Sequence, residues 1–354
     1  MKGGAYTGIK RTSFLFLAAM LVSCSGTPKA AEKAAPLWVT DAAKAYPNSE
    51  WLCVVEHEQD EKTAENAAVT RLAQVFRVDL NSVTSANRQL AEAIGNVRGK
   101  TTVATSQSSD IAQELVSTSV VSGLIGLQVE SWTNSRDGRA YANARMNRKE
   151  CSARYSAMIR ENEKVIDQLK TEAERYPETF EAFQMLNLAH SVALVTDNLH
   201  SMLTVLDTSA ISRRPSYGNA EAVKSLAQNA GRAIIVTVKV NGDNADRIAK
   251  AFSESLNSRG FRTDAGGINP YALDASFEME DVDLGNPRNK FVRYVLNCSL
   301  KNREGVEILS CSENGREGHL TESEARQRAI RAAESSISST GFASNFDAFL
   351  ASLL

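Results

Sequence analysis

The spacing of apolar side chains changes period along the chain, and these changes predict a mixture of strands and helices. Residues 51–55 form an apolar run typical of a strand, and residues 63–76 carry apolar side chains at helical spacing, with Thr63 as the expected N-cap. The stretch 95–110 lacks any period and is predicted to be a mobile loop. Four further strands are expected at residues 78–83, 115–121, 124–133 and 139–146, the last two joined by an Asp-Gly hairpin turn at 134–138.

From residue 148 the apolar positions follow a helical period over two long stretches. One stripe ends near Tyr176 and Pro177, and a second covers residues 180–206. Because the connection between them is very short, the two helices are expected to form an antiparallel hairpin. Residues 207–231 are rich in serine, arginine and turn-forming residues, and are predicted to be a linker with one short helix.

The last third of the chain returns to a mixed pattern. A β-branched strand at 233–240 precedes an amphipathic helix at 245–258, with Gly260 as its C-terminal stop. Thr321 and Glu324 have the spacing of a capping box at the start of a final helix. Strands are expected at 275–284, 291–301 and 306–314, and this last helix at 321–338.

The N-terminus has the pattern of an export signal. Basic residues precede an apolar run at 14–22, which is shorter than the ~20 residues that span a bilayer. Cys24 follows leucine, valine and serine, as in a bacterial lipobox, so residues 1–23 are predicted to be a lipoprotein signal peptide and Cys24 the lipidated first residue; an ordinary signal ending by chance in cysteine is the alternative. Residues 24–36 are expected to be a lipidated tether, and Ser25 favours the outer membrane.

Composition adds a domain count and excludes one class of partner. The chain has 354 residues, and the part after residue 36 is longer than one core usually organises. We therefore expect an α+β fold with two α/β-sandwich-like domains, at 37–206 and 232–354, the first ending in the helical hairpin. Lys plus Arg (40) nearly balance Asp plus Glu (42) without a basic patch, which makes nucleic acid an unexpected partner.

Two of the five cysteines are predicted to form a disulfide. Cys298 and Cys311 lie on strands that meet at a turn, and a two-residue turn at Glu304 and Gly305 places Cys298 directly opposite Cys311. This is a non-hydrogen-bonded pair with Cα atoms expected about 4.5 Å apart, at the short edge of disulfide range. An exported protein meets an oxidising compartment, so the bridge is expected to form; two buried thiols are the alternative. The pairing state of Cys53 and Cys151 stays open.

The sequence offers few residues for catalysis or metal binding. His57 between Glu56 and Glu58 is the densest titratable cluster, but strand alternation points the histidine away from the two carboxylates. His190 and His200 face different sides of one helix, and His319 precedes the last helix in a polar loop. We find no Gly-x-Ser-x-Gly, HExxH, Walker or CxxC motif, and therefore expect no catalytic residue, cofactor or metal.

One pair of aromatic residues has two interpretations. Trp132 and Tyr141 flank the predicted hairpin turn, and either pack across the strands or line a recognition surface. The alternation around both residues favours packing.

Residues 36–170 contain a set of motifs that point to a known family. The motifs are Pro36-Leu37-Trp38-Val39, Tyr46-Pro47, the strand at 51–55, the helix from Ala64, Trp132, the stretch 137–142, Arg148, Tyr155 and Ile159. With these motifs the N-terminal domain resembles the bacterial Lpp-twenty lipoprotein family, which includes flagellar outer-membrane accessory lipoproteins. The resemblance implies an exported, membrane-anchored α+β domain without known catalytic residues. The sequence departs from the family at Glu56-His57-Glu58 and in having a second domain.

Together these observations predict a non-enzymatic lipoprotein of the cell envelope. It would be anchored through Cys24 in the outer membrane, facing the periplasm, and would bind an unidentified envelope protein or glycan. A structural accessory of flagellar or envelope machinery is one alternative, and an envelope hydrolase whose site is assembled from distant residues is another.

Overall fold

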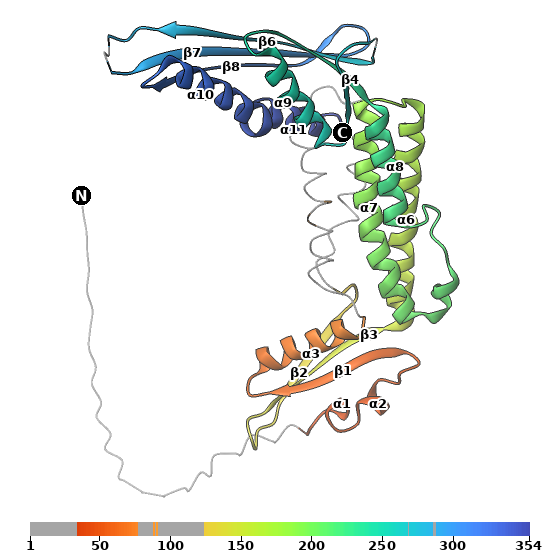
Figure 1. Cartoon of the computed structure of the whole chain (residues 1–354). Helices are drawn as coiled ribbons and strands as arrows, with labels where there is room; N and C mark the ends of the chain where they lie inside the picture. Colours follow the sequence, from red (N-terminus) through yellow and green to blue (C-terminus); the bar gives the residue numbers. More distant parts are fainter. Residues whose placement is uncertain (1–33, 77–87, 89, 91–123, 268, 286–287) are drawn as a thin grey trace, which may run out of the picture.

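The computed structural model describes residues 34–76, 88, 90, 124–267, 269–285 and 288–354. Two separate β-sheets lie at opposite ends of a bundle of long helices (Figure 1). Helices pack on each sheet, and the α+β class predicted from the sequence is confirmed. The signal peptide, Cys24, the strands expected at 78–83 and 115–121, and the loop expected at 95–110 lie outside the described residues.

The first sheet has three antiparallel strands in the order β1-β3-β2. Along the central strand β3, alternate residues Ala140, Ala142, Ala144 and Met146 are buried, and they face helix α3. The hairpin predicted at 134–138 joins β2 to β3, but β2 starts only at Gln128, because residues 124–127 form a turn. The bounds are β1 Trp51–Glu58, α3 Glu61–Val75, β2 Gln128–Thr133 and β3 Ala140–Asn147.

Helix α3 begins two residues earlier than the sequence pattern indicated. Its N-cap is Asp60, whose Oδ1 accepts the backbone N–H of Thr63 at 3.0 Å and whose Oδ2 accepts the Thr63 hydroxyl at 2.6 Å. The prediction of Thr63 as N-cap is therefore wrong. The N–H groups in the first turn of a helix have no intrahelical partner, and Asp60 accepts one of them, that of Thr63. Thr63 itself lies inside this first turn.

Short helices α1 (Leu37–Thr40) and α2 (Ala42–Ala45) lie on the side of the sheet opposite α3 (Figure 1). Tyr46, directly after α2, packs edge-on against Trp51 at 5.3 Å, and the Arg145 guanidinium lies 4.7 Å from the Tyr46 ring centroid. Asn143, which alternation places on this side of β3, is fully buried. The first sheet is thus covered on both faces.

The long helices α6 (Arg148–Arg175) and α7 (Phe180–Leu206) form the predicted antiparallel hairpin. The next segment, expected to be a linker, contains the 3-10 helix η1 (Thr208–Ser212) and then α8 (Ala220–Ala233), which packs on α7 as a third helix of the bundle. Val223 and Ala227 are buried at helical spacing on the packed face of α8. The Asp197 carboxylate on α7 fixes its start by accepting the Tyr217 hydroxyl at 2.7 Å and the Ala220 N–H at 2.8 Å.

Arg148 ties the first sheet to the bundle. This first residue of α6 donates from Nη1 to the carbonyl oxygens of Val205 (2.8 Å) and Leu206 (3.1 Å), and from Nε to the carbonyl of Asn48 (2.8 Å). The carbonyls at the end of a helix lack intrahelical partners and carry partial negative charge, so a guanidinium is a favourable partner there. Arg148 thus has a structural role.

The second sheet has five strands in the order β5-β4-β6-β7-β8. Strands β4 and β5 are parallel and connected through α9, whereas β6, β7 and β8 form antiparallel hairpins. Gly260 follows α9 with φ +93°, as a glycine stop requires. Strand bounds are β4 Ile235–Gly242, β5 Arg262–Asp264, β6 Tyr271–Val282, β7 Lys290–Lys301 and β8 Glu307–His319; helix α9 covers Ala245–Asn257.

The predicted Cys298–Cys311 disulfide is present, with Cα atoms 5.1 Å apart. The turn is longer than predicted, because Asn302 N–H donates to Val306 O and Gly305 takes φ +76°, which gives a three-residue loop. The predicted two-residue turn at Glu304 and Gly305 is therefore wrong. A β-bulge between Leu300 and Lys301 restores the register, so that Cys298 still faces Cys311.

Helices α9, α10 (Glu322–Ser335) and α11 (Phe342–Ala351) cover one face of the second sheet, with the π-helical turn η2 (Ser336–Thr340) between the last two (Figure 1). The Thr321 hydroxyl caps α10 as predicted, but the Thr321 N–H donates to His319 Nδ1, while the Glu324 carboxylate accepts from Arg331. Only half of the predicted capping box forms. Helix α11 was not predicted.

The tip of the helical hairpin is buried in the second domain. Phe180, the first residue of α7, is 1% exposed and belongs to the second domain's core. Its ring centroid lies 4.2 Å from that of Tyr271, and its ring packs edge-on against Phe261 and Phe346. Leu354, which follows α11 at the C-terminus, is buried in the core of the first domain. The two domains are therefore joined through shared packing as well as through the chain.

Candidate binding face

The outer face of the second sheet, opposite the helices, carries polar side chains. Along β6, Leu273, Ala275 and Phe277 point to the core, whereas Asp274 and Ser276 point outward. The same alternation on β7 and β8 gives an outer face of serine, asparagine and charged residues. This polarity is the first sign of a surface that contacts water or a polar partner.

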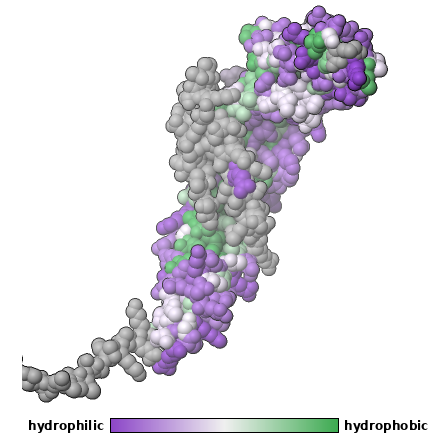
Figure 2. Space-filling view, turned by 90° about the vertical axis from the view of Figure 1, so that its left-hand side faces the viewer, coloured by the Kyte–Doolittle hydropathy of each residue, from purple (hydrophilic) through white to green (hydrophobic). Residues whose placement is uncertain are grey.

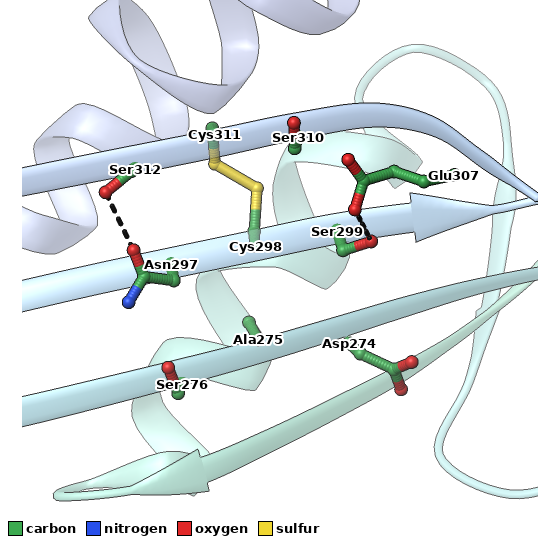
Figure 3. A pocket seen from close by; sticks show the side chains of 10 residues that line it. All are labelled: Asp274, Ala275, Ser276, Asn297, Cys298, Ser299, Glu307, Ser310, Cys311 and Ser312. Carbon is green, nitrogen blue, oxygen red and sulfur yellow. Dashed lines mark hydrogen bonds between the residues drawn. A yellow bond between two sulfur atoms is a disulfide. The ribbon is translucent and has the colours of Figure 1, made fainter.

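A hollow of about 550 Å³ lies on this face over β6, β7 and the edge strand β8, toward the end of the strands that adjoins the β7–β8 loop (Figure 3). Its floor consists of small hydroxyl and amide side chains in two register rows that cross the strands. Ser276, Asn297 and Ser312 lie opposite one another in one row, and Asp274, Ser299 and Ser310 in the next. Small side chains in the middle of a sheet, with longer ones beside them, leave the depression.

Hydrogen bonds fix the polar groups of the hollow. The Ser312 hydroxyl donates to Asn297 Oδ1 at 2.7 Å, and the Ser299 hydroxyl donates to Glu307 Oε2 at 2.6 Å (Figure 3). Hydrogen bonds from Ser299 and Ser310 lower the pKa of the exposed Glu307 carboxyl. Lys301 Nζ donates to Asp274 at 2.9 Å, so this lysine charge is neutralised at the rim.

The disulfide lies directly behind the hydroxyl rows. Cys298 and Cys311 alternate with the serines and are buried, while their bond joins β7 to the edge strand β8 (Figure 3). A covalent link at this position restricts the separation of the two strands that carry most of the floor. The hollow is therefore built on a restrained surface.

The chemistry of the hollow suits binding through hydrogen bonds. Hydroxyl and amide groups both donate and accept, and the carboxylates of Asp274 and Glu307 accept. Among the residues that line the hollow, none is a histidine, a lysine or a free thiol that would activate a serine as a nucleophile. The arrangement offers binding groups rather than a nucleophile with its base.

The charged cluster considered at Glu56, His57 and Glu58 lies at the end of β1. His57 stands opposite Tyr141, with ring centroids 5.6 Å apart, and the flanking glutamates face the other side of the strand. In the described ranges, no group of three histidine, cysteine, aspartate or glutamate side chains is placed to hold a metal ion. His57 and His319 belong to different sheets, so the structure does not bring them together.

His190 and His200 lie on α7 and are partly buried. Burial lowers the pKa of both imidazoles. His200 Nε2 is 3.8 Å from a Glu163 oxygen, too far for a hydrogen bond, and Arg213 pairs with the same carboxylate at 3.1 Å. The ion pair between Arg213 and Glu163 connects the segment after α7 to α6, so this charged group has a structural role.

Trp132 and Tyr141 are direct cross-strand partners, as the favoured interpretation predicted. Their ring centroids are 5.9 Å apart, and His57 extends the row across a third strand.

The free thiols of the described residues are Cys53, which donates to Asn143 Oδ1, and the buried Cys151. Neither the aromatic row nor these two thiols line the hollow.

The sequence did contain a signal for the hollow that the search for catalytic motifs missed. Serine or asparagine occurs at alternate positions of β7 and β8, around the cysteines (Asn297, Ser299, Ser310, Ser312). Once the disulfide had fixed the register, these residues could have been placed in adjacent rows. The contribution of β6 required knowing the strand order.

Comparisons with known proteins give no family for the chain. Neither a family model nor a curated protein matches it. Among solved structures, a minor lipoprotein of Acinetobacter baumannii matches at 11% identity and TM-score 0.24, over 29% of this chain and 90% of its own. A secreted protein of Helicobacter pylori matches at 12% identity and TM-score 0.36, over 82% of this chain and 98% of its own. Likeness at this level assigns no function.

In the described ranges no helix is long and apolar enough to cross a membrane.

Proposed function

We propose that this protein is a non-enzymatic lipoprotein of the cell envelope that binds an envelope component on the outer face of its second sheet. The observation that carries the proposal is the polar hollow of about 550 Å³ on β6, β7 and β8. Its lining supplies hydrogen-bonding groups from three adjacent strands.

The anchor is supported by sequence and the compartment by chemistry. The basic and apolar N-terminal pattern ending at Cys24 is that of a lipoprotein signal. The Cys298–Cys311 bridge fits an oxidising compartment, because disulfides persist in exported proteins and are rare in the cytosol. The residue after Cys24 is a serine and not an aspartate, which favours transfer of the lipoprotein to the outer membrane.

The helical bundle gives the hollow a fixed position relative to the first domain. Helix α6 has 28 residues, which corresponds to about 42 Å at 1.5 Å per residue. Buried Phe180 at one end of α7 and Arg148 against the other end connect the bundle to both sheets. The described surface is largely hydrophilic at both ends in the view of Figure 2, which suits exposure to water or to polar partners.

The first domain's similarity to the Lpp-twenty family supports a second proposal, that the protein is an accessory of flagellar or envelope machinery. The specific observation is that residues of the family-like pattern build the scaffold, with Trp132 paired to Tyr141 and Arg148 bound to the end of α7. In this role the protein would self-associate, and its mass in mild detergent would exceed that of a monomer.

Two measurements test the lipid anchor, and a third, in cells, tests the binding proposal. Cys24→Ser should move the protein from the membrane to the soluble fraction, and mass spectrometry of the wild-type N-terminal peptide should find acyl chains on Cys24. A photo-crosslinking amino acid at Ser312 should capture envelope material, whereas the same group at Glu280, outside the hollow on β6, should not. Equal adducts at both positions, or none at Ser312, would contradict the proposal.

A further inference from the structure

The two register rows of the hollow form a trough that crosses β6, β7 and β8. On β4, Lys239 and Asn241 stand beside Asp274 and Ser276, but neither lines the hollow. Three strands about 4.8 Å apart give the trough a length of about 10 Å. It ends at the edge strand β8, where it opens at the side of the sheet.

Small polar residues form the floor of the trough and longer side chains form its rims. The floor residues are Ser276, Asn297, Ser299, Ser310 and Ser312. On one rim lie Lys301 and Glu307, and on the other Glu278, Val295 and Asn314, which the register places side by side. A ligand in this trough would lie across the strands, with hydrogen-bonding groups beneath it and one apolar contact at Val295.

The direction of the trough disfavours an extended peptide. A peptide joins a sheet along an edge, parallel to the strands, and pairs with free backbone groups. The backbones of β6 and β7 are already paired on both sides, so over these strands the trough offers side-chain groups alone. The edge strand β8 has unpaired backbone groups on its outer side, but that edge runs along the strand and not across the strands as the trough does. The ligand must therefore carry many donors and acceptors of its own along a chain that crosses the strands.

The charges disfavour a polyanion such as nucleic acid or a phosphorylated polymer. The lining of the hollow has no arginine or lysine, Lys301 at the rim is paired with Asp274, and Lys239 lies beside Asp274 on β4 without lining the hollow. The carboxylates of Asp274 and Glu307 would repel anions but accept hydrogen bonds from hydroxyl groups. A neutral polyhydroxylated chain satisfies these groups without burying an unpaired charge.

We infer that the trough binds a short stretch of a neutral glycan lying across β6, β7 and β8. This inference rests on the proposed envelope-binding function and names the class of partner. The sugar hydroxyl groups would exchange hydrogen bonds with the serine and asparagine side chains of the floor, which act as both donors and acceptors. The carboxylates of Asp274 and Glu307 would accept further hydrogen bonds at the rim.

The test uses the full chain purified in mild detergent and four-unit soluble oligosaccharides of neutral hexoses and N-acetylhexosamines. The wild-type protein should bind at least one of them. Ser310→Tyr and Ser312→Tyr, which fill the trough with a residue that strands accommodate, should weaken that binding at least about tenfold. Glu280→Tyr, on the same face outside the trough, should leave it unchanged.

Asn297→Leu provides a second variant that removes the amide with little change in volume, in case a tyrosine variant fails to fold; retention of the disulfide and of the melting temperature identifies folded variants. Absence of binding to every oligosaccharide at millimolar concentration, or binding that the trough variants leave unchanged, overturns the glycan inference. If Ser312 crosslinks in cells to a polypeptide while no oligosaccharide binds, the proposed binding function stands and the glycan inference fails.

Discussion

The two sheets of this protein follow the same alternation but differ in what covers them. In the first sheet α3 packs on one face, and α1 and α2 lie on the other, so that even the polar Asn143 is fully buried. In the second sheet α9, α10 and α11 cover one face, and the other carries the hydroxyl-lined hollow. Alternation thus identifies a polar face, but tertiary packing decides whether that face becomes a surface for partners.

The sheets also differ in how they are held together. The first has no disulfide among its described residues and relies on coverage from both sides. The second has a helical layer on one side only and adds the Cys298–Cys311 bond between its last two strands. A covalent link replaces part of the restraint that a second layer would give.

The largest effect is expected where the bundle enters the second domain. Phe180→Ala should reduce the free energy of unfolding by about 3–5 kcal/mol, because it leaves a cavity among Phe261, Tyr271 and Phe346. Urea unfolding measures the change. Tyr176→Ala, at the same end of the hairpin but 61% exposed, is the matched control and should lose little. Equal losses for both variants would show that the Phe180 cluster is not a shared core.

Removing the disulfide should affect the second sheet and spare the first. Replacing both Cys298 and Cys311 by alanine opens a loop with a sequence separation of 13, for which about 3 kcal/mol of stability is expected to be lost. Amide exchange should rise in β7 and β8, while protection in β1 and β3 stays unchanged. Reduction of the wild-type protein should reproduce this pattern. Faster exchange in both sheets alike would contradict the comparison.

The disulfide also shows how far the sequence could predict this structure. The cysteine pairing was predicted with a two-residue turn, and the actual loop has three residues, which alone would have moved Cys298 out of register. The bulge beside Leu300 compensates for the extra residue. Cysteine positions carried the correct long-range information, whereas the turn residues Glu304 and Gly305 did not determine loop length.

Elements with a strong apolar period were predictable, and features that depend on tertiary contacts were not. The stripes of α6 and α7 gave a hairpin that the structure confirms. Helix α8 was assigned to a linker because its neighbours are polar, although Val223 and Ala227 already had helical spacing. The candidate binding face was not predicted, since serines on separate strands come together only when β6, β7 and β8 are in order.

A smaller effect is expected at the junction of the first sheet and the bundle. Arg148→Ala removes charged hydrogen bonds to the carbonyls of Val205, Leu206 and Asn48, and should cost about 1.5–3 kcal/mol in urea unfolding. Arg148→Lys should recover only part of this, because one ammonium group cannot reproduce the guanidinium fork. Full recovery by lysine would indicate that charge alone matters. The exposed neighbour Lys149, replaced by alanine, serves as the control.

The smallest effect is a pH dependence of stability that originates on the outer face of the second sheet. Hydrogen bonds from Ser299 and Ser310 lower the pKa of Glu307 below its ordinary value of 4.5. A carboxyl whose pKa is lowered on folding stabilises the native state above its unfolded pKa, and this contribution disappears as the pH falls through the folded pKa. The melting temperature of Glu307→Gln should therefore lie slightly below that of the wild type at pH 7, and the difference should shrink as the pH falls below 4.5. Glu304→Gln removes a charge from the same hairpin without touching Ser299, and a matching trend in that variant would assign the effect to net charge instead.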